Sequence, residues 1–212
     1  MTRATRDGVP VGVVTGEGLR AATLTAFEAA VLVRCTGAGG GGRARTSGVV
    51  RAQATTLVIG EFSSSEPADR LVALCPGSAR RTYTAGDRHR YAIHQVVGLP
   101  GAVERLGDGW HRGYAELCAP PSTARPASRF RHARDLARVA WRAATLVAGP
   151  TRAGAPGLRM PDLDTATLLI RAARLLDLPA GIATRPGGQI LVTLPVGSAR
   201  RHLDSIASLT AM

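Results

Sequence analysis

Apolar and polar positions alternate most clearly in the second half of the chain. Residues 132–148 contain no glycine or proline, and apolar residues recur every three or four positions with arginines between them. This pattern predicts a helix that ends before Gly149 and Pro150. The other elements predicted for this half are a strand before the turn at 154–156, strands at 157–160, 181–184 and 189–194, and helices at 164–176, capped by Asp164 and Thr165, and at 198–207.

The first half of the chain gives the same order of elements. A helix is predicted from Glu17 to Arg34, with Leu24, Phe27 and Val31 on one face, and a glycine run follows it. The remaining predicted elements are strands at 43–45, 49–53, 71–75 and 89–96 and helices at 55–62 and 100–106. Because both halves give the order αββαββα, we infer an internal duplication.

A proline-containing segment at 119–126 lies between the halves and has the composition of a linker. We therefore predict an N-terminal tail at 1–16, a first half at 17–118, a linker at 119–130 and a second half at 131–212. The length is sufficient for one domain of ordinary size or two small ones.

The net charge of +12 comes from 27 basic and 15 acidic residues among 212, and every basic residue is an arginine. The absence of lysine excludes a P-loop lysine and a Schiff-base lysine. Arginine pairs bidentately with phosphate, so nucleic acid is the first candidate partner. Aromatic residues make up only 4%, too few for single-strand stacking, which favours a duplex. A GC-rich genome also produces an arginine-rich composition, which is the alternative explanation for part of this charge.

No metal site, cofactor or membrane segment is predicted. Cys35, Cys75 and Cys118 form no CxxC pair, so we expect buried thiols in a reducing environment. His89 and His94 lie five positions apart on a predicted strand and therefore point to opposite faces, which disfavours a shared ion. Since no apolar run approaches the roughly 18 residues of a membrane span, we expect a cytoplasmic protein.

Residues 142–150, Arg-Ala-Ala-Thr-Leu-Val-Ala-Gly-Pro, resemble the Arg-Gly-Ala-Phe-Leu-Ala-x-Gly-Ser segment of the WhiA family of sporulation regulators. Residues 30–37 are similar to the first motif helix of that family, and residues 88–93 to its Asn-Arg-Tyr strand. The resemblance covers about residues 18–207. It implies an α+β, LAGLIDADG homing-endonuclease-like fold, a pseudo-twofold duplicated αββαββα with a saddle-shaped antiparallel sheet.

Two departures from that family bear on function. Active LAGLIDADG nucleases carry a metal-binding acid just before each terminal motif glycine, because a hard cation needs oxygen ligands. Here the motif glycines are Gly37 and Gly149, and the residues before them are Thr36 and Ala148. A second alignment of the two halves, based on the Ala-Ala-x-Leu-Val motif that they share, places Arg34 opposite Ala148 instead. In either register no carboxylate is present, so we expect no cleavage activity.

The second departure is at the end of the chain. WhiA-like proteins continue into a C-terminal helix-turn-helix, and this sequence ends at Met212, where that domain would begin. We therefore expect the principal DNA-reading domain of that family to be missing from this chain.

In a LAGLIDADG-type saddle, arginines on strand faces would line the concave DNA surface and contact phosphates. Strand alternation predicts Arg88, Arg90 and His94 on one face, with Tyr91 and Ile93 on the core side. The candidate nucleic-acid-binding residues are Arg43, Arg45, Arg51, Arg88, Arg90, His94, Arg159 and Arg185. A solvated sheet face is the alternative. Solvation is expected for the helix arginines, which are Arg134, Arg138, Arg171, Arg174, Arg200 and Arg201.

Three hypotheses for function follow, and the first of them rests on the resemblance. The first is an inactive, WhiA-related module in transcription regulation, in sporulation or cell division, with double-stranded DNA and a WhiB-type regulator as partners. The second is a protein-interaction module without DNA binding. The third is a metal-dependent endonuclease that uses acids elsewhere, such as Asp135 or Glu28.

Overall fold

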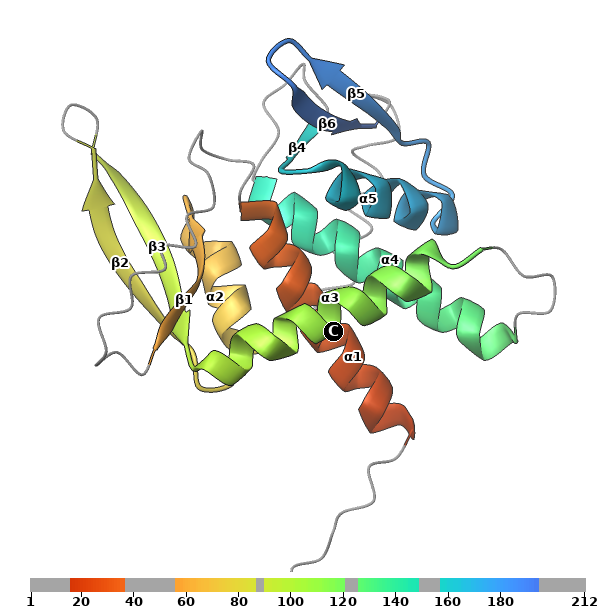
Figure 1. Cartoon of the computed structure of the whole chain (residues 1–212), viewed down its shortest axis with the longest axis horizontal. Helices are drawn as coiled ribbons and strands as arrows, with labels where there is room; N and C mark the ends of the chain where they lie inside the picture. Colours follow the sequence, from red (N-terminus) through yellow and green to blue (C-terminus); the bar gives the residue numbers. More distant parts are fainter. Residues whose placement is uncertain (1–15, 37–55, 87–89, 121–125, 149–156, 195–212) are drawn as a thin grey trace, which may run out of the picture.

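The computed structural model describes residues 16–36, 56–86, 90–120, 126–148 and 157–194. These residues form two antiparallel three-stranded sheets and five helices (Figure 1). The elements are α1 (Gly16–Cys35), β1 (Leu57–Phe62), α2 (Ser65–Leu74), β2 (Ala79–Ala85), β3 (Tyr91–Gly98), α3 (Pro100–Cys118), α4 (Ala127–Ala148), β4 (Gly157–Met160), α5 (Leu163–Leu175), β5 (Gly181–Arg185) and β6 (Gln189–Thr193). No described helix is long and apolar enough to cross a membrane.

The two sheets have the same topology. In sheet A the strand order is β1-β3-β2, and in sheet B it is β4-β6-β5. Each sheet places the last strand of its half in the centre, with the preceding strand paired to it as a hairpin neighbour. The helix between the first and second strands, α2 or α5, packs on one side of its sheet. This repetition confirms a duplicated architecture, although the described elements of each half begin αβαββ and do not show the complete αββαββα order predicted.

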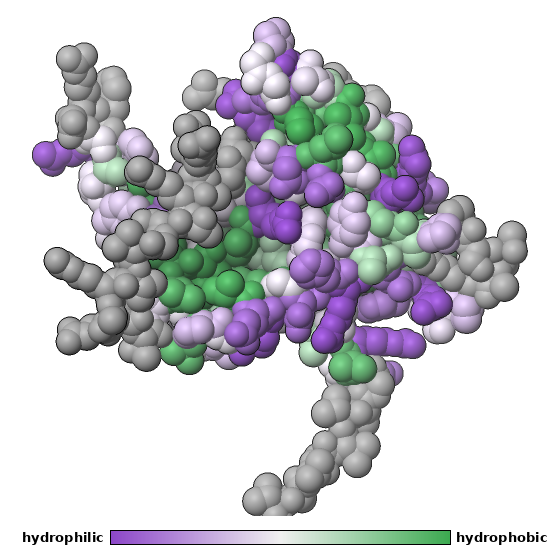
Figure 2. Space-filling view, in the orientation of Figure 1, coloured by the Kyte–Doolittle hydropathy of each residue, from purple (hydrophilic) through white to green (hydrophobic). Residues whose placement is uncertain are grey.

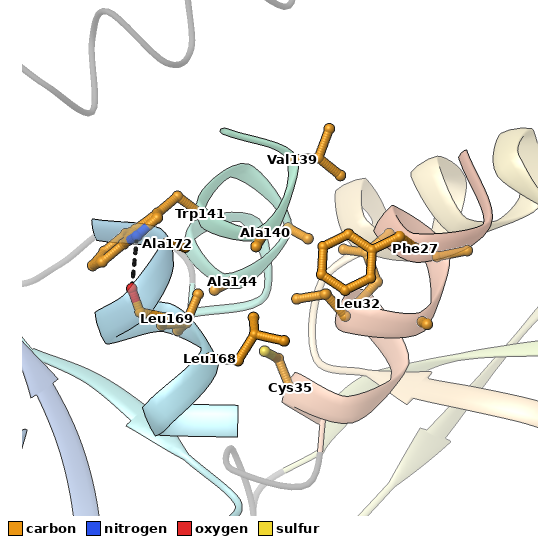
Figure 3. Close-up of a cluster of buried hydrophobic side chains, with 14 of the residues drawn as sticks. Phe27, Leu32, Cys35, Val139, Ala140, Trp141, Ala144, Leu168, Leu169 and Ala172 are labelled. Atoms are coloured by element: carbon orange, nitrogen blue, oxygen red, sulfur yellow. Dashed lines mark hydrogen bonds between the residues drawn. The ribbon is translucent and has the colours of Figure 1, made fainter. Parts of the chain in front are cut away.

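Helices α1 and α4 pack against each other at the centre of the molecule (Figure 3). Phe27 and Leu32 of α1 lie beside Ala140 and Ala144 of α4, and all four side chains are at most 1% exposed. Small alanine side chains allow the two helix backbones to approach closely, and the larger residues fill the space around them. The resulting core is continuous across both halves.

Helix α3 crosses α1 at two glycines. A Cβ atom at Gly109 would lie 2.7 Å from the carbonyl oxygen of Ala26, and one at Gly113 would overlap the ring of Phe27. These positions tolerate no side chain in the present packing, so glycine at both positions sets the distance between the two helices.

Two predicted elements of the first half are wrong. Residues 57–62 form strand β1 and not a helix, because β-branched and aromatic residues there bury one side against the core. Residues 71–75 end helix α2 and are not a strand. The helix predicted at 100–106 continues to Cys118, through glycines that the sequence suggests as breakers. Strand β2 was not predicted, whereas the helix at 17–34 and the strand at 89–96 are confirmed within two residues.

The second half follows the prediction more closely. Strands β4, β5 and β6 and helix α5 are confirmed, and α4 begins five residues earlier than expected. Helix α5 is capped by Asp162 rather than by Asp164 and Thr165, since the Asp162 side chain accepts from the Thr165 N–H at 2.7 Å. The strands predicted at 43–45, at 49–53 and before 154, and the helix at 198–207, lie outside the described residues. The domain boundaries stay a prediction.

Candidate nucleic-acid interface

Each sheet has one face covered by helices and one outer face. In sheet A, Phe62 and Val96 point into the core with 4% and 0% exposure, and Arg80 on the same side reaches Asp69 of α2 at 2.8 Å. The strand register then defines outer face A, which carries Val58, Glu61, Ala79, Arg81, Tyr83, Ala85, Tyr91, Ile93, Gln95 and the buried Val97. These side chains come from all three strands.

A β-bulge in β1 is needed to form this face. The register shifts between Val58 and Gly60, so Ile59 is an extra residue on its strand. Ile59 is 7% exposed, while its neighbour Val58 is 53% exposed. Because of the extra residue, Val58 and Glu61 share the outer face although they are three positions apart.

Outer face A holds a polar row across the three strands. Glu61 is paired with Gln95, which is paired with Arg81 on the far side. The Glu61 Oε1 atom accepts hydrogen bonds from the Tyr83 hydroxyl at 3.0 Å and from the Gln95 amide at 2.9 Å. Burial, the hydrogen bond to Glu61 and the charge of Glu61 raise the pKa of Tyr83. The row thus presents an acid, an amide and a guanidinium side by side.

Sheet B has an outer face of different composition. Leu158, Met160 and Val192 point into the core, so alternation places Arg159 and Arg185 on the opposite side. The residues of outer face B are Gly157, Arg159, Gly181, Ala183, Arg185, Gln189, Leu191 and Thr193. Both arginines are exposed and their neighbours are mostly small. This face is basic and has no acidic residue among its described positions.

The predicted binding residues are only partly brought together. Arg159 and Arg185 share outer face B, as the hypothesis requires. Arg90 is exposed and directly precedes β3. His94 lies on the helix-covered side of sheet A, where its Nδ1 is 3.1 Å from the Thr82 hydroxyl oxygen. Four predicted positions lie outside the described residues, namely Arg43, Arg45, Arg51 and Arg88.

The predicted orientation of the strand at 89–96 is wrong. Tyr91 and Ile93 belong to outer face A, and Tyr91 is 57% exposed. The orientation is shown by Val96, which is fully buried in the core cluster with Phe62, whereas Val97 at the other parity is buried but lies outside that cluster. At this end of β3 both sides of the strand are exposed, because Ala92 on the helix-covered side is exposed as well as Tyr91. The hydrophobic character of a side chain therefore does not indicate there which side faces the core.

Arg81, Tyr83 and Gln95 are outer-face residues that the sequence analysis missed. A signal for β2 does exist, because Arg81, Tyr83 and Ala85 alternate with Thr82 and Thr84 between two turn glycines. Threonine and tyrosine in such alternation favour a strand that is not deeply buried.

The arginines on helices are largely paired with acids or exposed to solvent. Arg138 bonds Asp135 at 2.7 Å, and Arg134 lies 3.9 Å from Asp177. Figure 2 shows hydrophilic side chains along α3, where Arg105 and other charged residues are exposed. Arg138 and Arg174 are exposed as expected, Arg134 and Arg171 are half-buried, and Arg200 and Arg201 lie outside the described residues.

The ends of α1 and α4 hold no acid at the motif positions. Thr36 follows α1 and its hydroxyl donates to the Val33 carbonyl at 2.7 Å, while Ala148 is the exposed last residue of α4. Gly37 and Gly149 lie outside the described residues. The nearby Asp162 caps α5 and lies 3.7 Å from Arg34, whose guanidinium stacks 4.2 Å from the Trp110 ring centroid. Among the described residues, no group of three potential metal ligands occurs.

Glu28 and Asp135, the two acids considered for a metal, are both engaged. Glu28 is 2% exposed, and its two oxygens accept from Arg70 and Arg142. Asp135 pairs with Arg138 on the surface of α4. Since four guanidinium N–H groups occupy the Glu28 carboxylate, this residue is not placed to bind a metal ion.

Comparison with known proteins identifies the fold. The chain is similar to the crystal structure of I-DmoI in complex with DNA and Mn, with a TM-score of 0.54 and 12% identity over 86% of this chain and 97% of that one. Mesophilic variants of the homing endonuclease I-DmoI match equally, with a TM-score of 0.54 and 12% identity over 88% of this chain and 97% of theirs.

The N-terminal LAGLIDADG domain of DUF199/WhiA has a TM-score of 0.47 and 11% identity over 94% of this chain and 93% of that domain. No protein-family model and no curated protein matches the sequence. The chain therefore has the predicted LAGLIDADG homing-endonuclease-like fold, and the likeness to these structures is one of fold.

Proposed function

We propose that the chain is a catalytically inactive LAGLIDADG-like module that binds double-stranded DNA through the outer faces of its two sheets. The observation that carries the proposal is the position of the exposed Arg159 and Arg185 on one basic face of sheet B, although Leu191 between their strands is buried. Small neighbours such as Gly181 and Ala183 leave both guanidinium groups accessible to a broad polyanion. Such groups match phosphate oxygens in bidentate geometry.

Outer face A complements this basic face with groups that can address bases. Arginine recognises guanine, glutamine recognises adenine and a carboxylate accepts from the cytosine amino group. Arg81 is exposed in the cross-strand row and presents the first of these chemistries, whereas Gln95 and Glu61 are hydrogen-bonded to each other and would have to exchange that bond for one to a base. A solved structure of similar fold is a complex with DNA, which supports the choice of a duplex as the ligand.

The lack of cleavage is argued from chemistry. At the motif positions, Thr36 and Ala148 supply no anionic oxygen for a divalent cation. The one buried acid on the central helices, Glu28, is neutralised by two arginines. Incubation of supercoiled plasmid with magnesium or manganese tests this part, and nicking above the level of a protein-free control would contradict it.

We further propose a role in transcription regulation of the WhiA type, in sporulation or cell division, with a WhiB-type regulator as a partner. This part rests on the resemblance of residues 142–150 and 30–37 to WhiA motifs. Co-purification of the chain with a WhiB-type protein, compared with a R159A/R185A variant, tests whether the partner uses the same face as DNA.

The DNA proposal is tested by binding affinity as a function of salt. Each phosphate contact contributes about 0.9 to the slope of log affinity against log salt. R159A/R185A should reduce the slope by about 2, whereas the helix variant R138A/R174A, with the same change of charge, should leave it nearly unchanged. Equal effects of both variants would show that only net charge matters.

A protein-interaction module is the second candidate, and outer face A favours it specifically. Tyr83 is 42% exposed, Tyr91 57% and Val58 53%, so three large apolar or aromatic side chains stand on one sheet face. Aromatic residues of this kind are enriched at protein interfaces. Absence of duplex binding at about 100 mM salt would favour this candidate.

A further inference from the structure

Helices α1 and α4 contain the same short sequence motif where they pack together at the centre of the fold. The two copies of the motif differ in the sign of their one charged residue. Residues 27–33 and 141–147 each read aromatic, charged, alanine, alanine, any residue, leucine, valine. In this register Phe27 corresponds to Trp141, and both are fully buried. The charged position is Glu28 in the first half and Arg142 in the second.

These two equivalent residues contact each other across the interface between the halves. Arg142 donates from Nε to Glu28 Oε1 at 3.0 Å and from Nη2 to Glu28 Oε2. Arg70 of α2 donates to the same two oxygens at 2.8 Å each. The Glu28 side chain is 3% exposed, against 24% for Arg142 and 34% for Arg70. The negative charge of the buried carboxylate is therefore compensated by arginines from both halves.

The third member of this cluster has no counterpart in the second half. When the helix caps Ser64 and Asp162 are aligned, Arg70 corresponds to Leu168, which is fully buried. A pair of two first halves would therefore bring two glutamates together with only Arg70 of each half to compensate them, and would lack the second arginine that each Glu28 has now. A pair of two second halves would bring two arginines together with no acid. Like charges at a buried contact are strongly unfavourable.

We propose that the Glu28–Arg142 pair selects the partner of each half, so that α1 pairs with α4 and neither helix pairs with its own copy in a second chain. The alanine-rich surfaces of α1 and α4 are otherwise similar, and apolar packing alone discriminates weakly between them. The charge pair supplies the discrimination, as a buried polar residue does in coiled coils.

The experiment uses two full-length charge-reversal variants, E28R and R142E. Alone, each variant has like charges at every possible contact between α1 and α4, and its folding equilibrium should shift by at least about a hundredfold. The two variants are then mixed in equal amounts in urea and refolded together. In this mixture, opposite charges meet only when α1 of one variant packs against α4 of the other variant. We expect a heterodimer of twice the 22.0 kDa chain mass by size exclusion with light scattering.

The controls separate partner selection from simple stability. D135R and R138D reverse a pair on the surface of α4, and alone or mixed they should stay monomeric. The variant E28R/R142E restores complementarity within one chain and should recover the monomer. The proposal is overturned if E28R and R142E each remain stable monomers, if E28R/R142E recovers while the mixture gives no heterodimer, or if neither the mixture nor E28R/R142E recovers.

Discussion

The indole N–H of Trp141 donates to the backbone carbonyl of Leu169 at 3.1 Å, inside the contact between α4 and α5 (Figure 3). Both side chains are fully buried. The hydrogen bond of the Trp141 indole is thus made to α5, the helix that covers sheet B. This bond fixes the rotation of α4 about its axis relative to that sheet.

Replacement of Trp141 by phenylalanine should destabilise the fold by about 2 kcal/mol, because it removes a buried hydrogen bond and leaves unfilled volume. Urea unfolding followed by circular dichroism measures the change. Leu19→Ala, at a side chain 59% exposed on α1, should stay within about 0.5 kcal/mol of the parent. A loss for W141F no larger than that of L19A would contradict the role assigned to the bond.

Alanine at Gly113 should destabilise by about 1 to 3 kcal/mol, since its Cβ would overlap the Phe27 ring and force α3 away from α1. The matched control is Gly107→Ala in the same helix, where nothing lies within 4 Å of the added Cβ. There the higher helix propensity of alanine should stabilise by up to about 1 kcal/mol. The two free energies of unfolding should therefore change in opposite directions, and equal signs would refute the packing argument.

Replacement of Glu28 by glutamine should cost about 3 to 5 kcal/mol, because two partly buried guanidinium groups lose their shared counter-ion. The surface change Asp135→Asn, which removes one exposed pair, should cost less than about 1 kcal/mol. Denaturant midpoints of the two variants give the comparison, and similar midpoints would mean that the Glu28 cluster adds no more than a surface pair.

Alkaline pH should destabilise the protein through Cys35. Burial raises the pKa of this thiol from 9.0 to about 12, with a smaller contribution from Asp162. The unfolded thiol therefore ionises first, so the stabilisation is complete below pH 9 and is lost as the pH rises toward 12, by roughly 1.4 kcal/mol per pH unit. Unfolding free energies of the parent and of Cys35→Ala between pH 8 and 11 measure this. If both fall with the same slope, other groups account for the loss.

Long periodic segments were predictable because their pattern repeats over several turns. Residues 132–148 and 17–34 each show helical spacing over four or more turns, and tertiary contacts only extend those helices. The hairpin of β5 and β6 was predictable from its Pro-Gly-Gly turn, where Gly187 and Gly188 adopt positive φ.

Short apolar runs were not predictable, since four to six residues fit a strand or a helix equally well. Residues 57–62 also contain a bulge, which breaks the alternation that would have marked them as a strand. The Glu28 cluster joins residues 42 and 114 positions apart, and no local pattern indicates which arginine of 27 meets a given acid. For outer face A, the position of Val96 in the core cluster decides the orientation, and this depends on the packing of α2 against β3, which no local pattern encodes.

The alanine contact between α1 and α4 has a consequence for the spacing of the two outer faces, which lie away from this contact. Ala140 and Ala144 determine how closely the two central helices approach, and each helix belongs to the half that carries one of the sheets. A larger residue at either position would push the halves apart and widen the span between Arg81 and Arg159. If the outer faces follow a duplex, these small interior side chains therefore help to set the spacing at which the two faces meet it.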